Sequence, residues 1–323
     1  MAVVTGASGF VGSWLCRTLA ESGIQVRGVA RHPPRHIPPG MLFHHADVLD
    51  PAALRPALAG ADMVVHLAAR VHVMQETAAN PLTEFRRANV EGTRIVLEEA
   101  VRAGVGRFVL ASTVKAVGEA NVAPWTEEVP PRPLDPYGVT KLEAEALVRE
   151  MAQRHSLHAS VLRLPLVYGP GMKGNMVRLF RLVDRGVPLP FGLVQNRRSL
   201  AFVGNVAGAV MAVLHSPAAW GETFFVSDGH DLSTPELLRA IGLALGRPVR
   251  LVPVPPALFR AAGRVGDLIA RVRPLPFTSD AIDRLLSSLA VDSSKLLRLT
   301  GYRPPYSVAE GLGLAADWYR GRM

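Results

Sequence analysis

The chain has 323 residues, of which 49% are hydrophobic and 20% are charged. This composition is typical of a globular protein and excludes a disordered chain. The net charge is +9, but the arginines are scattered, without a basic run or interleaved aromatic residues. Such a pattern favours a small anionic substrate over nucleic acid. The single cysteine, Cys16, excludes an internal disulfide. Neither a signal peptide nor an apolar stretch long enough for a transmembrane segment is recognisable, so we expect a cytoplasmic protein.

Short apolar runs alternate with amphipathic stretches along the first half of the chain. In chain order, the pattern predicts a strand at 1–5, a helix at 11–22, strands at 25–30 and 62–68, a helix at 89–103, a strand at 107–112, a helix at 136–154 and a strand at 157–164. This alternation is typical of a doubly wound parallel sheet. After position 165, turns and prolines become frequent, although 224–226 is typical of an added strand. We therefore predict an α/β protein with a Rossmann-type domain (1–165 and about 201–228) and a smaller, mainly helical substrate-binding domain (166–200 and 229–323).

A glycine-rich motif, T-G-A-S-G-F-V-G at positions 5–12, follows the first predicted strand and opens the first predicted helix. Its glycines allow a tight turn and let a pyrophosphate approach the backbone, where the free N–H groups of the helix N-terminus bind it. A glycine-rich turn without a ligand is the alternative, but the strand before and the helix after favour a dinucleotide site. The cofactor-binding residues predicted here are Gly6, Ser8, Gly9, Phe10, Val11 and Gly12.

Arg31 directly follows the second predicted strand, and there is no carboxylate at this point of the sequence. A carboxylate there would bind the ribose hydroxyls of NAD, whereas an arginine would bind the 2′-phosphate of NADP. The sequence therefore slightly favours NADP(H) over NAD(H), the alternative being a solvated arginine without a ligand. Asp47 is placed to accept a hydrogen bond from the adenine amino group. Neighbouring positions complete the predicted cofactor site with Val48, Leu67, Ala68 and Ala69.

Tyr137 and Lys141 lie four residues apart, which places both side chains on one face of a predicted helix. The lysine ammonium can lower the pKa of the phenol and bind the nicotinamide ribose, so that the phenol exchanges a proton while a hydride moves. Upstream, Ser112 and Thr113 end an apolar strand. Their hydroxyls can share the proton or hold a substrate oxygen.

These motifs together resemble the extended short-chain dehydrogenase/reductase family over nearly the whole chain, and its NAD-dependent epimerase/dehydratase branch most closely. The tail D-S-S-K at 292–295 adds to the resemblance. It implies that Tyr137 is the acid/base, that Lys141 lowers its pKa and binds the cofactor, and that Thr113 is its hydrogen-bond partner. The predicted catalytic residues are therefore Thr113, Tyr137 and Lys141, and no metal is expected.

The resemblance also implies that Arg198, seven residues before Asn205, binds the diphosphate of a nucleotide sugar. Asn205 itself departs from the aspartate usual in the family. The asparagine that many epimerases carry is replaced by Leu166, so Lys173 and Asn175 are predicted to supply those contacts, the alternative being a polar surface loop. The predicted substrate-binding residues are Ser112, Thr113, Lys173, Asn175 and Arg198.

Dehydratases of this branch place Asp-Glu directly after the threonine, where this chain has Val114-Lys115. Lysine and valine cannot perform that carboxylate chemistry, so a 4,6-dehydratase is not expected. The stretches 66–74, 168–175 and 196–200 resemble a bacterial subgroup that includes UDP-4-keto-6-deoxy-HexNAc 4-reductases of surface-polysaccharide biosynthesis and proteins labelled UDP-glucose 4-epimerases.

We therefore expect an enzyme that transfers a hydride at C4 of a nucleotide-diphosphate sugar. Reduction of a 4-keto sugar with NADPH is slightly preferred because of Arg31, and 4-epimerisation of a UDP-glucose or UDP-HexNAc substrate is the alternative. A non-catalytic NAD(P)-sensing regulator is disfavoured because Thr113, Tyr137 and Lys141 are all present. A reductase of a non-nucleotide carbonyl is disfavoured by Arg198. The resemblance further implies a homodimer, formed through the helices at 89–103 and 136–154.

Overall fold

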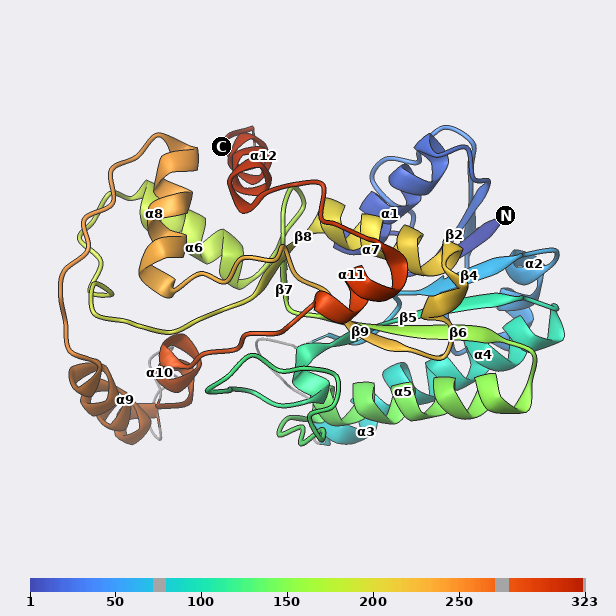
Figure 1. Ribbon diagram of the computed structural model, residues 1–323, viewed down its shortest axis with the longest axis horizontal. Helices are drawn as coiled ribbons and strands as arrows, with labels where there is room; N and C mark the ends of the chain where they lie inside the picture. Colours follow the sequence, from blue (N-terminus) through green and yellow to red (C-terminus); the bar gives the residue numbers. More distant parts are fainter. Residues whose placement is uncertain (72–79, 271–278, 322–323) are drawn as a thin grey trace.

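The structure is a computed structural model that describes residues 1–71, 80–270 and 279–321. Its centre is a seven-stranded sheet in the order β3-β2-β1-β4-β5-β6-β9 (Figure 1). Each neighbouring pair of strands is parallel. The strands are β1 (Ala2–Thr5), β2 (Val26–Ala30), β3 (Met41–His45), β4 (Met63–His66), β5 (Arg107–Thr113), β6 (His158–Leu164) and β9 (Thr223–Phe225). The direction of winding reverses between β1 and β4, which confirms the predicted doubly wound, Rossmann-type fold.

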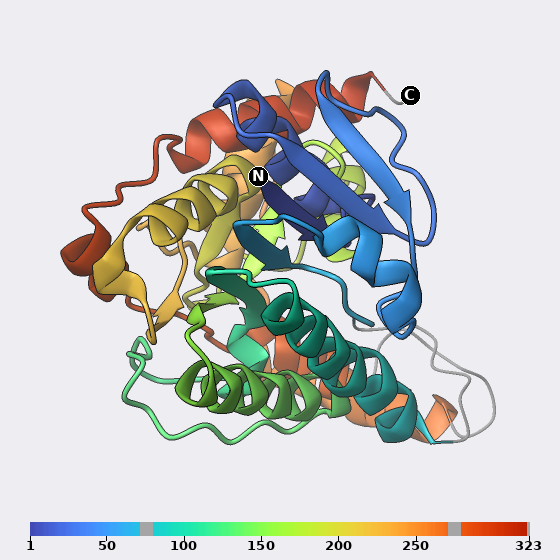
Figure 2. The ribbon, with the colours of Figure 1, turned by 90° about the vertical axis from the view of Figure 1, so that its right-hand side faces the viewer.

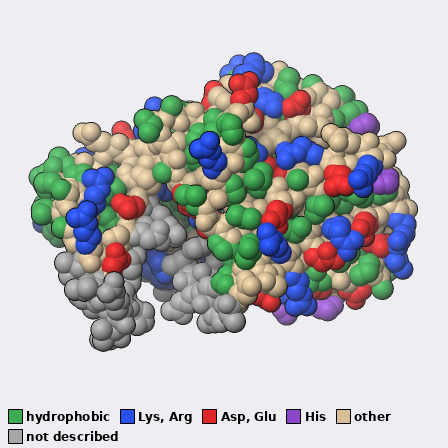
Figure 3. Space-filling view, turned by 90° about the horizontal axis from the view of Figure 1, so that it is seen from below, with side chains coloured by type: hydrophobic (Ala, Val, Ile, Leu, Met, Phe, Trp, Pro, Cys, Tyr) green, Lys and Arg blue, Asp and Glu red, His purple; other side chains and the backbone are tan. Residues whose placement is uncertain are grey.

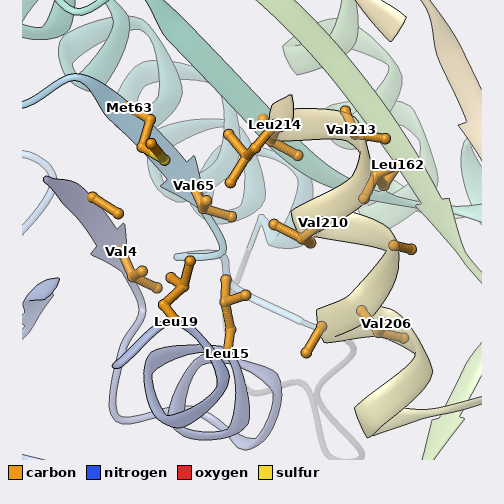
Figure 4. Packing of buried hydrophobic residues seen from close by; sticks show 14 of the residues in the cluster. Val4, Leu15, Leu19, Met63, Val65, Leu162, Val206, Val210, Val213 and Leu214 are labelled. Carbon is orange, nitrogen blue, oxygen red and sulfur yellow. The ribbon is translucent and has the colours of Figure 1, made fainter. Parts of the chain in front are cut away.

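Helices cover both faces of this sheet (Figure 2). One face is covered by α1 (Phe10–Glu21), α7 (Val203–His215) and α11 (Ser294–Thr300), and the other by α2 (Pro51–Leu58), α4 (Gly92–Arg102) and α5 (Pro136–Arg154). Figure 4 shows Val65 of β4 near Leu15 of α1 and Val210 of α7, in one apolar cluster. The central strands are buried on both faces, which explains why they read as continuous apolar runs.

A second group of elements lies beyond the carboxyl ends of the strands, at the left of Figure 1. It contains the parallel pair β7 (Leu166–Tyr168) and β8 (Leu200–Phe202), with α6 (Asn175–Asp184), α8 (Thr234–Leu245), α9 (Pro256–Ala270) and α10 (Ser279–Leu286). Helix α12 (Val308–Arg320) packs on α8 and shares an apolar core with α6 and β8, built around Phe180, Phe202 and Leu238. The chain returns from this group to the sheet through α7 and β9, and β9 is the added strand expected at 224–226.

Two elements of the sheet region, β3 and α2, are not predicted from the sequence. Strand β3 lies at the sheet edge, and only its first residue, Met41, is buried. The strand follows proline-rich sequence and ends in two histidines, so it lacks the apolar run of a central strand. Helix α2 is short, contains Pro56, and begins at the Asp50 cap. The predicted helix at 89–103 begins instead with α3 (Pro81–Arg86) and a π-helical turn, η1 (Arg87–Glu91), before α4.

Among the helices of the described ranges, none combines the length and the apolar character needed to cross a bilayer. Where the face seen in Figure 3 is described, Lys and Arg side chains are interspersed with Asp and Glu side chains and form no continuous basic area. That distribution agrees with the scattered arginines of the sequence.

Candidate active site

The turn between β1 and α1 can be built only with glycines. Gly6 has φ +71°, and a Cβ atom on it would lie 2.8 Å from the amide nitrogen of Ala68. A Cβ on Gly12 would lie 2.2 Å from the carbonyl oxygen of Gly6. Helix α1 has Gly9 at its N-cap, with no side-chain cap and no acid in its first turn. This helix end therefore suits a phosphate group, so the residues present fit the pyrophosphate of a dinucleotide.

The other predicted cofactor residues lie along the same edge of the sheet. Arg31 is exposed directly after β2, and the backbone of β2 receives a 2.8 Å hydrogen bond from the Gly6 amide at Val29. Asp47 follows β3 and accepts a hydrogen bond from the amide of Leu49 at 3.1 Å. The next side chain, Val48, packs against the start of α4 at Gly92. After β4, the amide of Ala68 donates to the Thr5 hydroxyl at 3.3 Å, which holds 67–69 beside the glycine turn.

Helix α5 carries the Tyr-Lys pair and begins where the sequence predicts. Pro136 occupies its first turn, and the Asp135 carboxylate accepts a hydrogen bond from the Gly138 amide at 2.6 Å. Gly138 lets this helix end approach the chain after β5, since a Cβ there would lie 2.3 Å from the Lys115 carbonyl oxygen. This close packing brings the end of β5 to the start of α5, and Thr113 forms a side-chain hydrogen bond with Tyr137.

Burial dominates the electrostatics of the pair. It raises the pKa of Tyr137 to about 12, which the Thr113 hydrogen bond partly offsets and the charge of Asp135 reinforces. Lys141 is 2% exposed, and burial lowers its pKa to about 8 against the opposing charge of Glu145. An ammonium that titrates near neutrality one turn from a phenol can assist the ionisation of that phenol.

A chain of buried polar side chains connects the sheet to α5, and the sequence interpretation missed it. The Thr5 hydroxyl lies 2.7 Å from Nδ1 of His66, whose Nε2 lies 3.0 Å from the Thr93 hydroxyl. Asn89, in the π-helical turn, donates to the Thr140 hydroxyl at 3.1 Å, next to Lys141. Burial and the charge of Lys141 lower the pKa of His66 to about 3, so this ring is neutral. In the sequence, this network could have been recognised from the polar residues at positions 89 and 93, which lie on the inward-facing, otherwise apolar side of the helix.

Ser112 is placed differently from its neighbour Thr113. Successive side chains of a strand point to opposite faces, and the Ser112 hydroxyl donates to the Glu145 carboxylate of α5 at 2.5 Å. Arg163 of β6 donates to the same carboxylate at 3.1 and 2.8 Å. The Ser112 hydroxyl is thus engaged in a buried network with α5, and its expected contact with substrate stays a prediction. Glu145 and Arg163 are further site residues that the sequence interpretation missed.

The segment 169–174 packs on the start of α1. Trp14 Nε1 donates to the Pro170 carbonyl oxygen at 3.0 Å, and Gly171, with φ +94°, lies against the ring of Phe10. Lys173 and Asn175, both exposed, follow this contact in the chain, and their role in substrate binding stays a prediction. Of the quoted stretch 66–74, positions 72–74 lie outside the described residues.

Arg198 lies in the second group of elements, where its backbone pairs with Leu232 at 2.9 and 3.0 Å. Burial lowers the pKa of its guanidinium, and the negative charge of Glu119 opposes that shift. Arg198, which is predicted to bind the substrate diphosphate, thus interacts electrostatically with Glu119, a short distance along the chain after β5.

A doubly wound sheet, a glycine turn at the start of α1, and a Tyr-Lys pair bonded to a threonine define an enzyme of the short-chain dehydrogenase/reductase type. A sequence model of the NAD dependent epimerase/dehydratase family matches residues 2–226. The chain therefore belongs to the NAD dependent epimerase/dehydratase family, which confirms the predicted membership.

Relatives within the family carry different printed functions. The "UDP-glucose 4-epimerase" of Vibrio cholerae is 36% identical over 319 residues, which cover 98% of this chain and 94% of that protein. The "dTDP-glucose 4,6-dehydratase" of Streptomyces griseus is 31% identical over 333 residues, covering 98% and 93%. Among solved structures, MoeE5 in complex with UDP-glucuronic acid and NAD has a TM-score of 0.78 and 29% identity, covering 100% of this chain and 99% of that chain.

Proposed function

We propose that this protein transfers a hydride at C4 of a nucleotide-diphosphate sugar. The observation that carries the proposal is the Tyr137 phenol, hydrogen-bonded to Thr113 and one helical turn from the buried Lys141. The glycine turn that fits a dinucleotide supports it. MoeE5, whose structure holds a UDP-sugar and NAD, supports this class of substrate and cofactor.

In the reducing direction, Tyr137 donates its proton to the C4 oxygen, and Thr113 holds the phenol in place. A bound nicotinamide dinucleotide would supply the hydride. Lys141, one helical turn along α5, stabilises the phenolate left behind and is proposed to bind the cofactor ribose. In the oxidising direction, the same phenolate removes the proton of the C4 hydroxyl. Lys173, Asn175 and Arg198, from the substrate side (166–200 and 229–323), are proposed to hold the diphosphate.

Reduction of a 4-keto sugar with NADPH is the direction we propose. Arg31 supports this direction. It directly follows β2, where no carboxylate is present to bind the ribose hydroxyls of NAD, and an arginine there suits the 2′-phosphate of NADPH. The second candidate is 4-epimerisation, which the printed function of the Vibrio cholerae relative supports. 4,6-Dehydration receives no support from the residues after Thr113, since the ammonium of Lys115 is bound by Asp135 and Glu119. The homodimer through α4 and α5 and the cytoplasmic location remain predictions.

The proposal is tested on freshly purified protein. The protein is denatured and any released dinucleotide is identified, and the native protein is then assayed with NADPH and a UDP-4-keto-6-deoxy sugar and, separately, with UDP-glucose and UDP-GlcNAc. Oxidation of NADPH that requires the keto sugar supports reduction. Stoichiometric released NAD⁺ with interconversion of C4 epimers supports the second candidate. If no sugar nucleotide is converted while each cofactor binds, C4 chemistry on these substrates is excluded.

A further inference from the structure

Lys115 lies at the centre of a cluster of charged side chains just after β5. It belongs to the short 3₁₀ helix η2 (Val114–Ala116). Its ammonium donates to Asp135 Oδ2 at 2.7 Å and to Glu119 Oε1 at 3.0 Å. The three side chains are only 22%, 17% and 21% exposed, respectively. Partial burial makes these ion pairs stronger than pairs on an open surface.

The two oxygens of Asp135 have different partners. Oδ1 accepts the hydrogen bond from the Gly138 amide at 2.6 Å and so caps α5, while Oδ2 accepts from Lys115. The lysine therefore fixes the carboxylate that begins the helix carrying Tyr137. On its other side, the Lys115 amide donates to the Thr113 hydroxyl at 3.3 Å, and Thr113 bonds to Tyr137. Lys115 thus contacts both residues that set the position of the phenol.

The charge of Asp135 acts directly on the phenol, since it raises the pKa of Tyr137. Within the described part of the chain, the groups near Tyr137 include the Thr113 hydroxyl, Lys141 one turn along α5, and the Phe85 ring of α3, 6.2 Å from the Tyr137 ring. Arg70 lies over that Phe85 ring at 5.4 Å, and His66 of β4 is neutral. Glu119 and Arg198 lie further out along the Lys115 cluster. Lys115 places a positive charge directly on the Asp135 carboxylate.

We propose that Lys115 is a positioning residue for Tyr137: its ion pair with Asp135 holds the start of α5 and offsets the carboxylate charge beside the phenol. The inference rests on the proposed function only in that Tyr137 is the group that exchanges the proton. Its consequence is specific to charge, because the neutral isostere asparagine at position 135 still caps a helix. Removing Lys115 and removing the Asp135 charge should therefore act on the phenol in opposite directions.

The test follows the ionisation of Tyr137 itself, without any sugar. The chain contains five tyrosines, which are replaced biosynthetically by 3,5-difluorotyrosine, whose phenol is more acidic than that of tyrosine. The ¹⁹F signal that disappears in Tyr137→Phe is assigned to position 137. Its pH midpoint is then measured in the wild type, Lys115→Met, Lys115→Arg, Asp135→Asn and the double variant Lys115→Met/Asp135→Asn.

Lys115→Met should raise the midpoint by about one pH unit, and Asp135→Asn should lower it by a similar amount. Lys115→Arg should stay near the wild type, and the double variant should return towards it. A purely structural role would lower thermal stability without producing shifts of opposite sign. Unchanged midpoints, or shifts of the same sign, in variants with native circular dichroism would overturn the proposal. Because no sugar takes part, the expected shifts in a protein without C4 activity would refute the proposed function and leave this inference standing.

Discussion

Glu145 and Arg163 form a buried ion pair directly behind the Tyr-Lys pair. The side chain of Glu145 is 0% exposed and that of Arg163 is 4% exposed. Two hydrogen bonds join them, and the guanidinium also lies 5.6 Å from the centre of the Phe225 ring. Glu145 stands one turn after Lys141 on α5, Arg163 is on β6, and Phe225 is on β9. One charge pair thus connects the helix that carries the catalytic candidates to two strands of the sheet.

Glu145→Gln should destabilise the protein by about 3–5 kcal/mol, because it leaves the guanidinium buried without a counter-charge. The control is Glu150→Gln on the same helix, whose partner Arg154 is 69% exposed and whose loss should cost less than about 1 kcal/mol. Urea unfolding of both variants gives the comparison. Equal small losses would show that the buried pair does not hold α5 to the sheet. The double variant Glu145→Gln/Arg163→Met should be more stable than the single Glu145→Gln variant.

Tyr137→Phe should reduce kcat by about 10²- to 10⁴-fold, the usual contribution of a positioned acid/base. Cofactor affinity should change little, because only the phenol oxygen is removed. Tyr306→Phe is the matched control, since Tyr306 contacts Asn205 through its backbone, away from α5. Steady-state kinetics on the sugar nucleotide identified above, with cofactor titrations, provide the measurement. Wild-type kcat in Tyr137→Phe would remove the phenol from the mechanism.

The buried Lys141 should make the cofactor-free protein more stable as the pH rises. Its pKa is lowered from 10.5 to about 8 in the folded state, so between these values the unfolded chain binds the proton more. The free energy of unfolding therefore gains up to about 1.4 kcal/mol per pH unit from this group. Urea unfolding of the wild type and Lys141→Met between about pH 7.5 and 9.5 isolates the effect. Parallel pH dependences in the two proteins would mean that Lys141 keeps an ordinary pKa when folded.

Arg31→Ala should weaken the binding of NADPH by at least about tenfold and leave that of NADH nearly unchanged, because a charge-assisted hydrogen bond to the 2′-phosphate contributes about 1.5–3 kcal/mol. Arg154→Ala, at the far end of α5, controls for the loss of one positive charge. Fluorescence titration of the reduced nicotinamide measures both affinities. Equal changes for NADPH and NADH would assign Arg31 to the solvated surface.

The parts of the fold that follow from the sequence are those with strong local signals. Asp135 and Pro136 mark the start of α5, and the central strands have the continuous apolar runs of a sheet covered on both faces. Strand β3 escapes because an edge strand needs few apolar residues. The direction of the Ser112 hydroxyl is not predicted for another reason: the sequence A-S-T does not indicate which of the two hydroxyls faces helix α5. That choice depends on Glu145, which lies 33 residues away.

The buried polar chain through Asn89 escapes because a π-helical turn shifts the phase of the helix that carries it. The family resemblance identifies Tyr137 and Lys141, whose spacing is local. It does not reveal that Lys115 and Asp135 meet across 20 residues of chain.

Strand β9 has a consequence for the order in which the chain can be completed during synthesis. It pairs with β6 at Val161–Arg163 but follows it by nearly sixty residues, most of which build the other group of elements. Until Phe225 emerges from the ribosome, β6 is an unpaired edge strand that can pair with another chain. Arg163 also lacks its contact with the Phe225 ring until then. A fragment ending at Pro165 would keep the glycine turn and the Tyr-Lys pair but would expose this edge. The protein therefore needs its second half to finish the sheet of its first.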